Sequence, residues 1–452
     1  MTEPPSPTVP VDLRRHLSRP RAGLKLLFLC HRVPYPPNKG ERIRAFHTLS
    51  GLARRHRVHL LALDDGAGAD PGPLAALCER VEVFPLSRSA AYLRAALDAW
   101  RPRPLTLSFF ASTAMAQRLR ELVRGERFDA LVVYSSAMAP YAELAPELPA
   151  VLAMVDLDSA KWAQYARFAP LALRPVYALE ARRLRRYEAA LAGRFQRIVL
   201  ATGNETRLYK SFAPGARAET VLSGVDFDFF QRFDLPRAVR PTLVFTGQMD
   251  YFANVDGVVH FARKVFPRLR QRFPEIQLLV VGRSPVPSVR DLGELPGVQV
   301  TGAVGDVRPF LARAWVFVAP LRIAQGVQNK VLEAMAAELP VVCSERVLAG
   351  LSDGGFRSGR DLMAASSDDE MERAVAALIE DAGARDRLAE HARQRLCASY
   401  RWAPNVERFE ELVGAVARPP AGSPLPAEAW RREHDAGMPS AAGPEEAEAL
   451  HA

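Results

Sequence analysis

The chain has 452 residues and a mass of 49.8 kDa, with 48% hydrophobic and 25% charged residues. This composition is typical of a globular protein of two or three domains, and it excludes a disordered, collagen-like or disulfide-scaffold chain. No apolar run approaches the roughly 18 residues that cross a bilayer, and the first residues lack the layout of a secretory signal. The four cysteines are scattered without a C-x-x-C spacing, so we expect free thiols and a cytoplasmic protein.

The net charge of +9 favours anionic partners such as nucleotides or phospholipids. The sequence has no zinc-finger spacing, no RNP-like aromatic motif and no basic run with interleaved aromatics. We therefore expect no nucleic-acid partner.

Short apolar runs alternate with amphipathic stretches along the first half of the chain, after a proline-rich segment at residues 1–22 that predicts a disordered arm. The helix expected at residues 40–55 has an apolar residue at every third position from Ile43 to Leu52. The predicted strands are residues 24–30, 58–63, 81–85, 130–134, 151–155 and 198–202. Apolar strands joined by helices indicate a parallel sheet covered on both faces.

The same pattern restarts after a proline-containing linker at residues 232–241. The predicted strands of this half are residues 242–247, 277–282, 298–301, 315–320, 340–344 and 361–365. The predicted helices are residues 254–273, 306–314, 327–338, 368–380 and 384–398. We expect two doubly wound α/β domains at residues 23–234 and 241–399, facing a central cleft, and a disordered tail at residues 418–452.

The most informative stretch is residues 315–344, which predict a strand, a loop and a helix followed by another strand. The free N–H groups of the helix's first turn form an anion site at the end of the strand. Gly326 lets a phosphate approach the backbone, and Lys330 adds a positive charge in that turn. Glu333 lies on the same face, where a carboxylate suits the hydroxyls of a ribose. On helix physics alone, a capped helix with a solvent-facing Lys–Glu pair remains open as an alternative.

This stretch resembles the E-x7-E region of family 4 glycosyltransferases, which have the two-domain GT-B fold. The resemblance implies that Glu333 holds the nucleotide ribose and that Gln325, which replaces the first Glu, touches the donor sugar. It also implies that the backbone of Gly326, Val327 and Gln328 cradles the diphosphate.

Other segments resemble the same family in order and spacing. Residues 30–40 resemble its first strand–helix loop, which places Lys39 and Gly40 on the acceptor side. Residues 244–254 resemble the loop that opens the second domain, where Gly247 approaches the diphosphate. Here Gln248 stands where a basic residue is frequent in the family.

Two further matches complete the resemblance. Residues 300–304 resemble the loop that packs on the nucleotide base, with Gly302 on the donor side. Residues 221–230 resemble the segment near the crossover between domains. As in the fold family, residues 400–417 are then expected to form a helix that crosses back to the first domain.

The runs PPNKGERIRAFH, VDLDSAKWAQYA, GVQNKVLEAMA and GRDL resemble the sugar transferases associated with PEP-CTERM/exosortase exopolysaccharide systems. This resemblance implies transfer from a nucleotide-diphosphate sugar to a polysaccharide or polyprenyl-diphosphate-linked acceptor, with retention and without a metal or other cofactor. Lys330 and Arg322 would stabilise the departing diphosphate. A basic helix expected at residues 179–191 is either a solvated face or a site of peripheral association with the inner face of the cytoplasmic membrane.

Rival functions have weaker signals. A D-x-D pair at residues 156–158 is typical of metal-dependent transferases, but a second copy at 226–228 shows how easily it arises by chance. We interpret Asp156 instead as a cleft residue near the acceptor. A dinucleotide enzyme needs G-x-G-x-x-G after the first strand, and the sequence has none there. A catalytically inactive sugar-nucleotide binder and a GT-B sugar-nucleotide epimerase remain alternatives.

Overall fold

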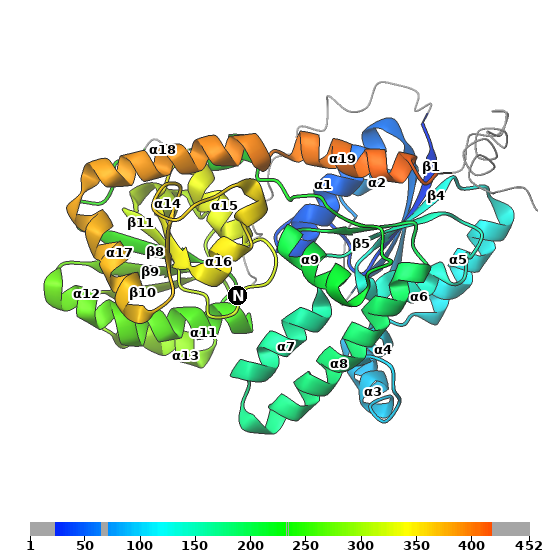
Figure 1. Ribbon diagram of the computed structural model, residues 1–452, viewed down its shortest axis with the longest axis horizontal. Helices are drawn as coiled ribbons and strands as arrows, with labels where there is room; N and C mark the ends of the chain where they lie inside the picture. The colour runs from blue at the N-terminus through cyan, green and yellow to red at the C-terminus, as the bar shows by residue number, and fades with distance from the viewer. Residues whose placement is uncertain (1–22, 65–70, 232, 234, 418–452) are drawn as a thin grey trace, which may run out of the picture. The chain divides into compact units, whose positions relative to one another are not determined.

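The computed structural model describes residues 23–64, 71–231, 233 and 235–417. The disordered arm and tail predicted at residues 1–22 and 418–452 lie outside the described residues. The described part belongs to a compact unit that ends at Ala417 and contains two sheets (Figure 1). Every helix in the described part is too short or too polar to cross a bilayer.

The first sheet has seven parallel strands in the order β3-β2-β1-β4-β5-β6-β7. Their bounds are β1 Lys25–Cys30, β2 Arg57–Asp64, β3 Arg80–Pro85, β4 Ala130–Tyr134, β5 Ala150–Ala153, β6 Arg197–Leu200 and β7 Ala218–Thr220. The six strands predicted in this half are confirmed within a few residues. The edge strand β7 was missed because its three residues, Ala-Glu-Thr, contain no apolar run.

Helices cover both faces of this sheet, and α1 has the bounds predicted from its apolar spacing. The helices of this half are α1 Gly40–Arg55, α2 Leu74–Leu77, α3 Arg88–Leu97, α4 Leu105–Phe109, α5 Thr113–Gly125, α6 Ala139–Ala142, α7 Asp158–Phe168, α8 Arg174–Ala190, α9 Gly203–Phe212 and α10 Phe227–Phe230. In the predicted linker at 232–241, the described residues form neither helix nor strand.

The second sheet has six parallel strands in the order β10-β9-β8-β11-β12-β13. They are β8 Thr242–Thr246, β9 Gln277–Val281, β10 Val298–Gly302, β11 Val316–Ala319, β12 Val341–Ser344 and β13 Met363–Ala365. Its helices are α11 Phe252–His260, α12 Phe266–Arg272, α13 Pro287–Arg290, α14 Arg308–Arg313, α15 Asn329–Ala336, α16 Glu345–Ala349, α17 Asp368–Glu380 and α18 Ala382–Ser399.

The single helix predicted at residues 254–273 is wrong in one respect, because a π-helical turn, Phe261–Val265, separates α11 from α12. At the end of this turn, the Phe266 N–H bonds the Phe261 carbonyl five residues back. Pro267 follows directly and has no N–H to continue the α-helical ladder. The wider turn accommodates the proline without ending the helical run.

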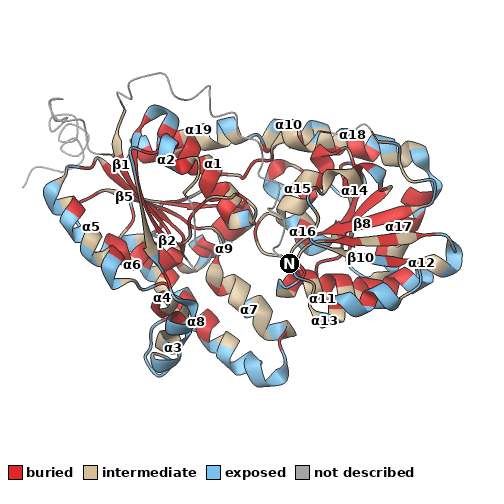
Figure 2. Ribbon diagram, turned by 180° about the vertical axis from the view of Figure 1, so that it is seen from behind, coloured by how far each residue is buried: buried red, intermediate tan, exposed pale blue. Residues whose placement is uncertain are grey.

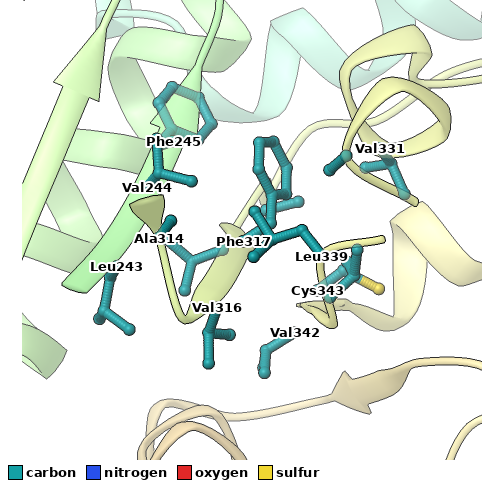
Figure 3. Packing of buried hydrophobic residues seen from close by; sticks show 14 of the residues in the cluster. Leu243, Val244, Phe245, Ala314, Val316, Phe317, Val331, Leu339, Val342 and Cys343 are labelled. Carbon is teal, nitrogen blue, oxygen red and sulfur yellow. The ribbon is translucent and has the colours of Figure 1, made fainter. Parts of the chain in front are cut away.

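The inner strands of both sheets are largely buried, the edge strands β3, β7, β10 and β13 are only partly buried, and the helices expose their outer faces (Figure 2). Such near-continuous burial is typical of parallel strands covered on both sides. In the second half, Phe245 of β8, Phe317 of β11 and Cys343 of β12 pack in one cluster with Val331 of α15 (Figure 3). This packing fixes which face of α15 points away from the sheet.

A last helix, α19 Trp402–Gly414, packs against α1 of the first half. Its buried residues Phe409, Leu412 and Val413 join the apolar cluster on one face of the first sheet. The approach is close, since a Cβ built on Gly51 would lie 2.1 Å from Cγ1 of Val406. The C-terminal helix therefore returns to the core of the first half.

We predict that Phe409→Ala lowers the free energy of unfolding by about 3–5 kcal/mol, because it empties a buried aromatic site in this core. Urea unfolding followed by circular dichroism measures the change. Arg408→Ala is the matched control, since its half-exposed ion pairs with Glu219 and Glu411 contribute about 0–1 kcal/mol. Equal unfolding midpoints for the two variants would contradict the docking of α19 on the first half.

Candidate active site

The loop from β11 to α15 lies at the carboxyl edge of the second sheet. Here Gly326 has φ +64°, a left-handed conformation that favours glycine. A Cβ on Gly326 would also lie 2.8 Å from Oδ1 of Asp156, which comes from the first half of the chain. The loop therefore faces the first sheet's half, as the predicted cleft requires.

The helix predicted to begin at Val327 begins two residues later, at Asn329. Val327 stays in the loop, packed on the core, and Gln328 occupies the N-cap position with an extended backbone. The Gln328 side chain donates to the Gln325 carbonyl oxygen at 3.1 Å, so its Nε2 stabilises the loop. The Val331 N–H of the first turn of α15 donates to the Gln328 carbonyl oxygen at 2.9 Å, so the amides of Asn329 and Lys330 are the ones left for an anion.

Lys330 and Glu333 lie on the face of α15 opposite its buried stripe, and both are half-buried. The Lys330 ammonium donates to Oδ1 of Asn254 and lies 4.6 Å from the centroid of the Phe245 ring. Burial lowers the pKa of Lys330 to about 7 and raises the pKa of Glu333 to about 7, and each charge only partly offsets the other's desolvation. An anion bound here would stabilise the ammonium form of Lys330.

Glycines allow a close approach of the carboxyl ends of β8 and β9 beside this ammonium. A Cβ on Gly247 would lie 3.1 Å from Nζ of Lys330, and a Cβ on Gly282 would lie 1.7 Å from the Gly247 carbonyl oxygen. At the end of β10, no heavy atom lies within 4 Å of the Cβ position of Gly302, outside its two chain neighbours. The predicted donor-side glycines thus share one edge of the sheet with Lys330.

Arg283 is a basic residue of this edge that the sequence analysis missed. In the amide orientation that satisfies both side chains, Oε1 of Gln248 accepts from Nε and Nη2 of Arg283 at 2.8 and 2.7 Å. A cation therefore lies beside the neutral residue that follows Gly247. Arg283 could have been predicted from its position two residues after β9, because residues that follow parallel strands gather at one edge of the sheet.

Arg322, a predicted catalytic residue, is already engaged. Its guanidinium forms two hydrogen bonds with the Asp256 carboxylate and lies 5.5 Å from the Phe168 ring centroid. The Asp256 contact raises the pKa of Arg322. Its guanidinium is therefore already paired with a carboxylate, whereas the Lys330 ammonium donates to the neutral Asn254 side chain.

The predicted acceptor-side residues approach the loop from the first half. A Cβ on Gly40 would lie 3.6 Å from Nδ2 of Asn329 in the first turn of α15. Lys39 precedes α1 as its N-cap, and burial lowers the pKa of its ammonium. Asp156, beside Gly326, forms an ion pair with Lys161 at 3.0 Å.

Gln325 connects the two halves of the molecule. Its Oε1 accepts from Nε2 of Gln164 at 2.6 Å, and its Nε2 donates to Oε1 of Glu205 at 3.2 Å. Tyr165 and Tyr251 form a further hydrogen bond across the same gap, with 2.8 Å between their hydroxyl oxygens. Gln164 and Glu205 were not predicted from the sequence, because they belong to helices far along the chain from the motif.

The carboxylates of the two D-x-D pairs have other partners. Asp158 accepts from the Ser136 hydroxyl at 2.6 Å, and Asp156 pairs with Lys161. Asp226 caps α10 by accepting from the Phe229 N–H at 3.0 Å. Within the described ranges, no three His, Cys, Asp or Glu side chains are grouped to hold a metal ion.

Residues 240–381 match the model of a family described as glycosyl transferases group 1. This segment contains the whole second sheet and every predicted donor-binding residue. Over 249 residues the chain is 31% identical to a phosphatidyl-myo-inositol mannosyltransferase of Mycolicibacterium smegmatis. That match covers 51% of this chain and 60% of the length of the relative.

Solved glycosyltransferase structures share the architecture of both halves. A sucrose-phosphate synthase from Thermosynechococcus elongatus aligns with a TM-score of 0.64 at 14% identity, covering 86% of this chain and 98% of that chain. Anabaena HepE in complex with UDP and glucose aligns with a TM-score of 0.61 at 14% identity, covering 87% and 100%. At such identities the likeness shows the fold, and the predicted GT-B class of two Rossmann-like domains is confirmed.

We predict that Glu333→Ala weakens the binding of a nucleoside diphosphate, measured with both UDP and GDP, about tenfold or more, because a hydrogen bond to a charged group is lost. The melting temperature should stay almost unchanged, since the side chain lies off the buried stripe. Isothermal titration calorimetry measures the affinity. Glu345→Ala is the control, because it removes an exposed carboxylate from the neighbouring helix α16, and unchanged affinity in both variants would defeat the ribose assignment.

Proposed function

We propose that this chain is a glycosyltransferase that moves a sugar from a nucleotide-diphosphate sugar to a saccharide or polyprenyl-diphosphate-linked acceptor. The observation that carries the proposal is the Lys330 ammonium, which lies at the end of β8 beside Gly247 and next to the first turn of α15. The group 1 family match spans this site, and the mannosyltransferase relative and the UDP complex of HepE agree with it.

The chemistry requires stabilisation of the departing diphosphate, because negative charge builds there as the bond from the anomeric carbon to the phosphate oxygen breaks. Lys330 and the first-turn amides of α15 would supply it from fixed positions. Arg283 would add a second cation at the same edge, while Glu333 binds ribose hydroxyls and Gln325 meets the sugar.

The finer assignments are part of the same proposal. The reaction retains the anomeric configuration and needs no divalent metal, since fixed cations and helix dipoles stabilise the leaving group and Lys161 and Ser136 occupy the D-x-D carboxylates. The chain acts in exopolysaccharide synthesis as a hexosyltransferase of family 4, in the branch associated with PEP-CTERM systems.

A protein that binds sugar nucleotides without turnover is the second candidate, because Gln325 and Gln248 are both neutral at the site. A sugar-nucleotide epimerase is a third candidate, which would consume no acceptor. The three functions differ in their products, so one assay separates them.

We predict that the protein, supplied with a nucleotide sugar and a lipid-linked saccharide acceptor, releases nucleoside diphosphate and extends the acceptor by one sugar. EDTA should leave this rate unchanged, because no step uses a divalent ion. Coupled detection of the diphosphate and mass spectrometry of the acceptor measure both products. Loss of activity in EDTA with recovery in Mn²⁺ would favour the metal-dependent alternative, and tight donor binding without diphosphate release would favour the binder.

The acceptor side has a surface suited to a membrane. Eight of the eleven exposed large hydrophobic residues in the described part lie on or beside α3 and at the start of α8. They are Tyr92, Leu93, Leu97, Trp100, Leu171, Leu173, Val176 and Leu179. The Arg183 guanidinium donates to the Ala99 carbonyl oxygen at 2.8 Å, which joins the two segments, and both views show α3 beside α8 (Figures 1 and 2).

Arginines lie along the same segments as these apolar residues. Exposed arginines on or next to α3 and along α7 and α8 are Arg88, Arg101, Arg103, Arg167, Arg174, Arg182, Arg185 and Arg186. Exposed apolar side chains and cations on the same segments complement an anionic lipid surface. The proposed occupant is therefore the inner face of the cytoplasmic membrane, where a polyprenyl-linked acceptor would reside.

We predict that the protein sediments with phosphatidylglycerol vesicles and not with phosphatidylcholine vesicles, and that salt weakens the binding. Trp100→Ala combined with Leu171→Ala should reduce the bound fraction several-fold, because both side chains are more than three-quarters exposed, at 79% and 77%. Val239→Ala, at a 96% exposed apolar residue far along the chain, is the control. Equal binding of the double variant and the control would overturn the surface assignment.

A further inference from the structure

Glu205 is a buried carboxylate of the first half, 1% exposed, in the first turn of α9. Its backbone N–H donates to Oγ1 of Thr202 at 3.2 Å, and its Oε2 accepts from the same hydroxyl at 2.9 Å. Its Oε1 accepts from the Leu157 N–H at 2.9 Å. These contacts fix the carboxylate in one position at the carboxyl edge of the first sheet.

The side chain of Gln325 bridges the two halves of the site through this carboxylate. Glu205 Oε1 accepts from Nε2 of Gln325 at 3.2 Å, while Oε1 of Gln325 accepts from Gln164 at 2.6 Å. A carboxamide can donate and accept at once, which both partners require. An ionised carboxylate could only accept, so it would lose the contact with Glu205.

Charge adds a second reason for an amide at position 325. Asp156 reaches the adjacent Gly326. The burial of Glu205, together with the nearby charge of Asp156, raises the pKa of Glu205 to about 7. Arg44 is the buried cation that acts on both carboxylates, and Lys161 pairs with Asp156. A further negative charge at position 325 would therefore meet carboxylates that already repel each other.

We propose that Glu205 is a positioning residue for Gln325, and that its carboxyl group is contributed by the first half to the sugar end of the donor site. It orients the carboxamide of Gln325 so that this group meets the donor sugar rather than turning away from it. The inference rests on the proposed function, because it assigns a role within the same donor site. Neutral Gln325 is then matched to Glu205 and does not mark a lost activity.

The test is an exchange of charge between the two positions, read as a ratio of two affinities. Calorimetry gives the affinity for a nucleoside diphosphate and for its sugar conjugate, with UDP and UDP-glucose and with GDP and GDP-mannose as the probes. The variants are then measured with whichever of these two pairs the unchanged protein binds. The ratio isolates the contribution of the sugar, and it does not depend on the fraction of protein that is folded.

We expect Gln325→Glu to lower the affinity for the sugar conjugate about tenfold or more, relative to the diphosphate, because a charge-assisted hydrogen bond becomes a repulsion. Glu205→Gln should lower the same ratio. The double variant Glu205→Gln with Gln325→Glu should recover part of it, since an amide again faces a carboxylate, while the Leu157 N–H loses the acceptor that Oε1 of Glu205 supplies. If Gln325→Glu alone fails to fold, the test is made with the double variant, which should both fold and recover the affinity ratio.

Gln117→Glu is the matched control, because Nε2 of Gln117 donates to Oε1 of Glu121 at the same 3.2 Å but on the exposed surface of α5. It should leave both affinities unchanged. The inference would be overturned if the variants still bind the diphosphate but Gln325→Glu does not lower the affinity ratio. It would also be overturned if the double variant does not recover that ratio. A protein that binds neither diphosphate would instead overturn the proposed function itself.

Discussion

The site depends on one desolvated cation, the Lys330 ammonium, at the carboxyl edge of the second sheet. Lys330 meets the neutral Asn254 side chain and the face of the Phe245 ring, and Glu333 acts on it through its charge. The cost of desolvating the ammonium outweighs its attraction to Glu333, so the pKa of Lys330 is lowered to about 7. A diphosphate that pairs with the ammonium would offset the cost of desolvating it. This electrostatic stabilisation is largest when the leaving diphosphate carries its full negative charge.

Backbone geometry makes this arrangement accessible to a ligand. Gly247 and Gly282 allow the ends of β8 and β9 to approach each other beside the ammonium, where side chains would fill the space. The left-handed Gly326 turns the loop toward the first half before α15 begins. The same edge therefore combines fixed dipoles, a cation and closely approaching backbone, which together suit the binding of a phosphoester.

Much of the fold could be predicted because buried parallel strands are apolar along their whole length. The sequence analysis placed twelve of the thirteen strands of the described part, and it missed only β7, whose residues Ala-Glu-Thr sit at a sheet edge. The helix containing Pro267 was predicted, but its π-helical turn was not, since periodicity does not register one extra residue. Lys330 and Glu333 could be found because they occupy the polar face of an otherwise apolar helix.

The partners of the site residues could not be predicted. Arg283 and Glu205 reach the site from other strand ends, and no spacing in the sequence links them to the motif at Gln325. Sequence comparison presents Gln325 as a departure from a family pattern, whereas the structure pairs it with a carboxylate from the other half. Which charges share a site is decided by tertiary packing, and local pattern carries little information about it.

The depressed pKa of Lys330 offers the most direct test of the account. Calorimetric titration of the protein with UDP at pH 8, in buffers of different ionisation enthalpy, counts the protons exchanged on binding. Free UDP is fully ionised at this pH, so the account predicts uptake of close to one proton by the protein, and no uptake in a Lys330→Met variant. Binding of UDP without proton uptake, or equal uptake in the variant, would contradict the claim that a buried lysine receives the diphosphate.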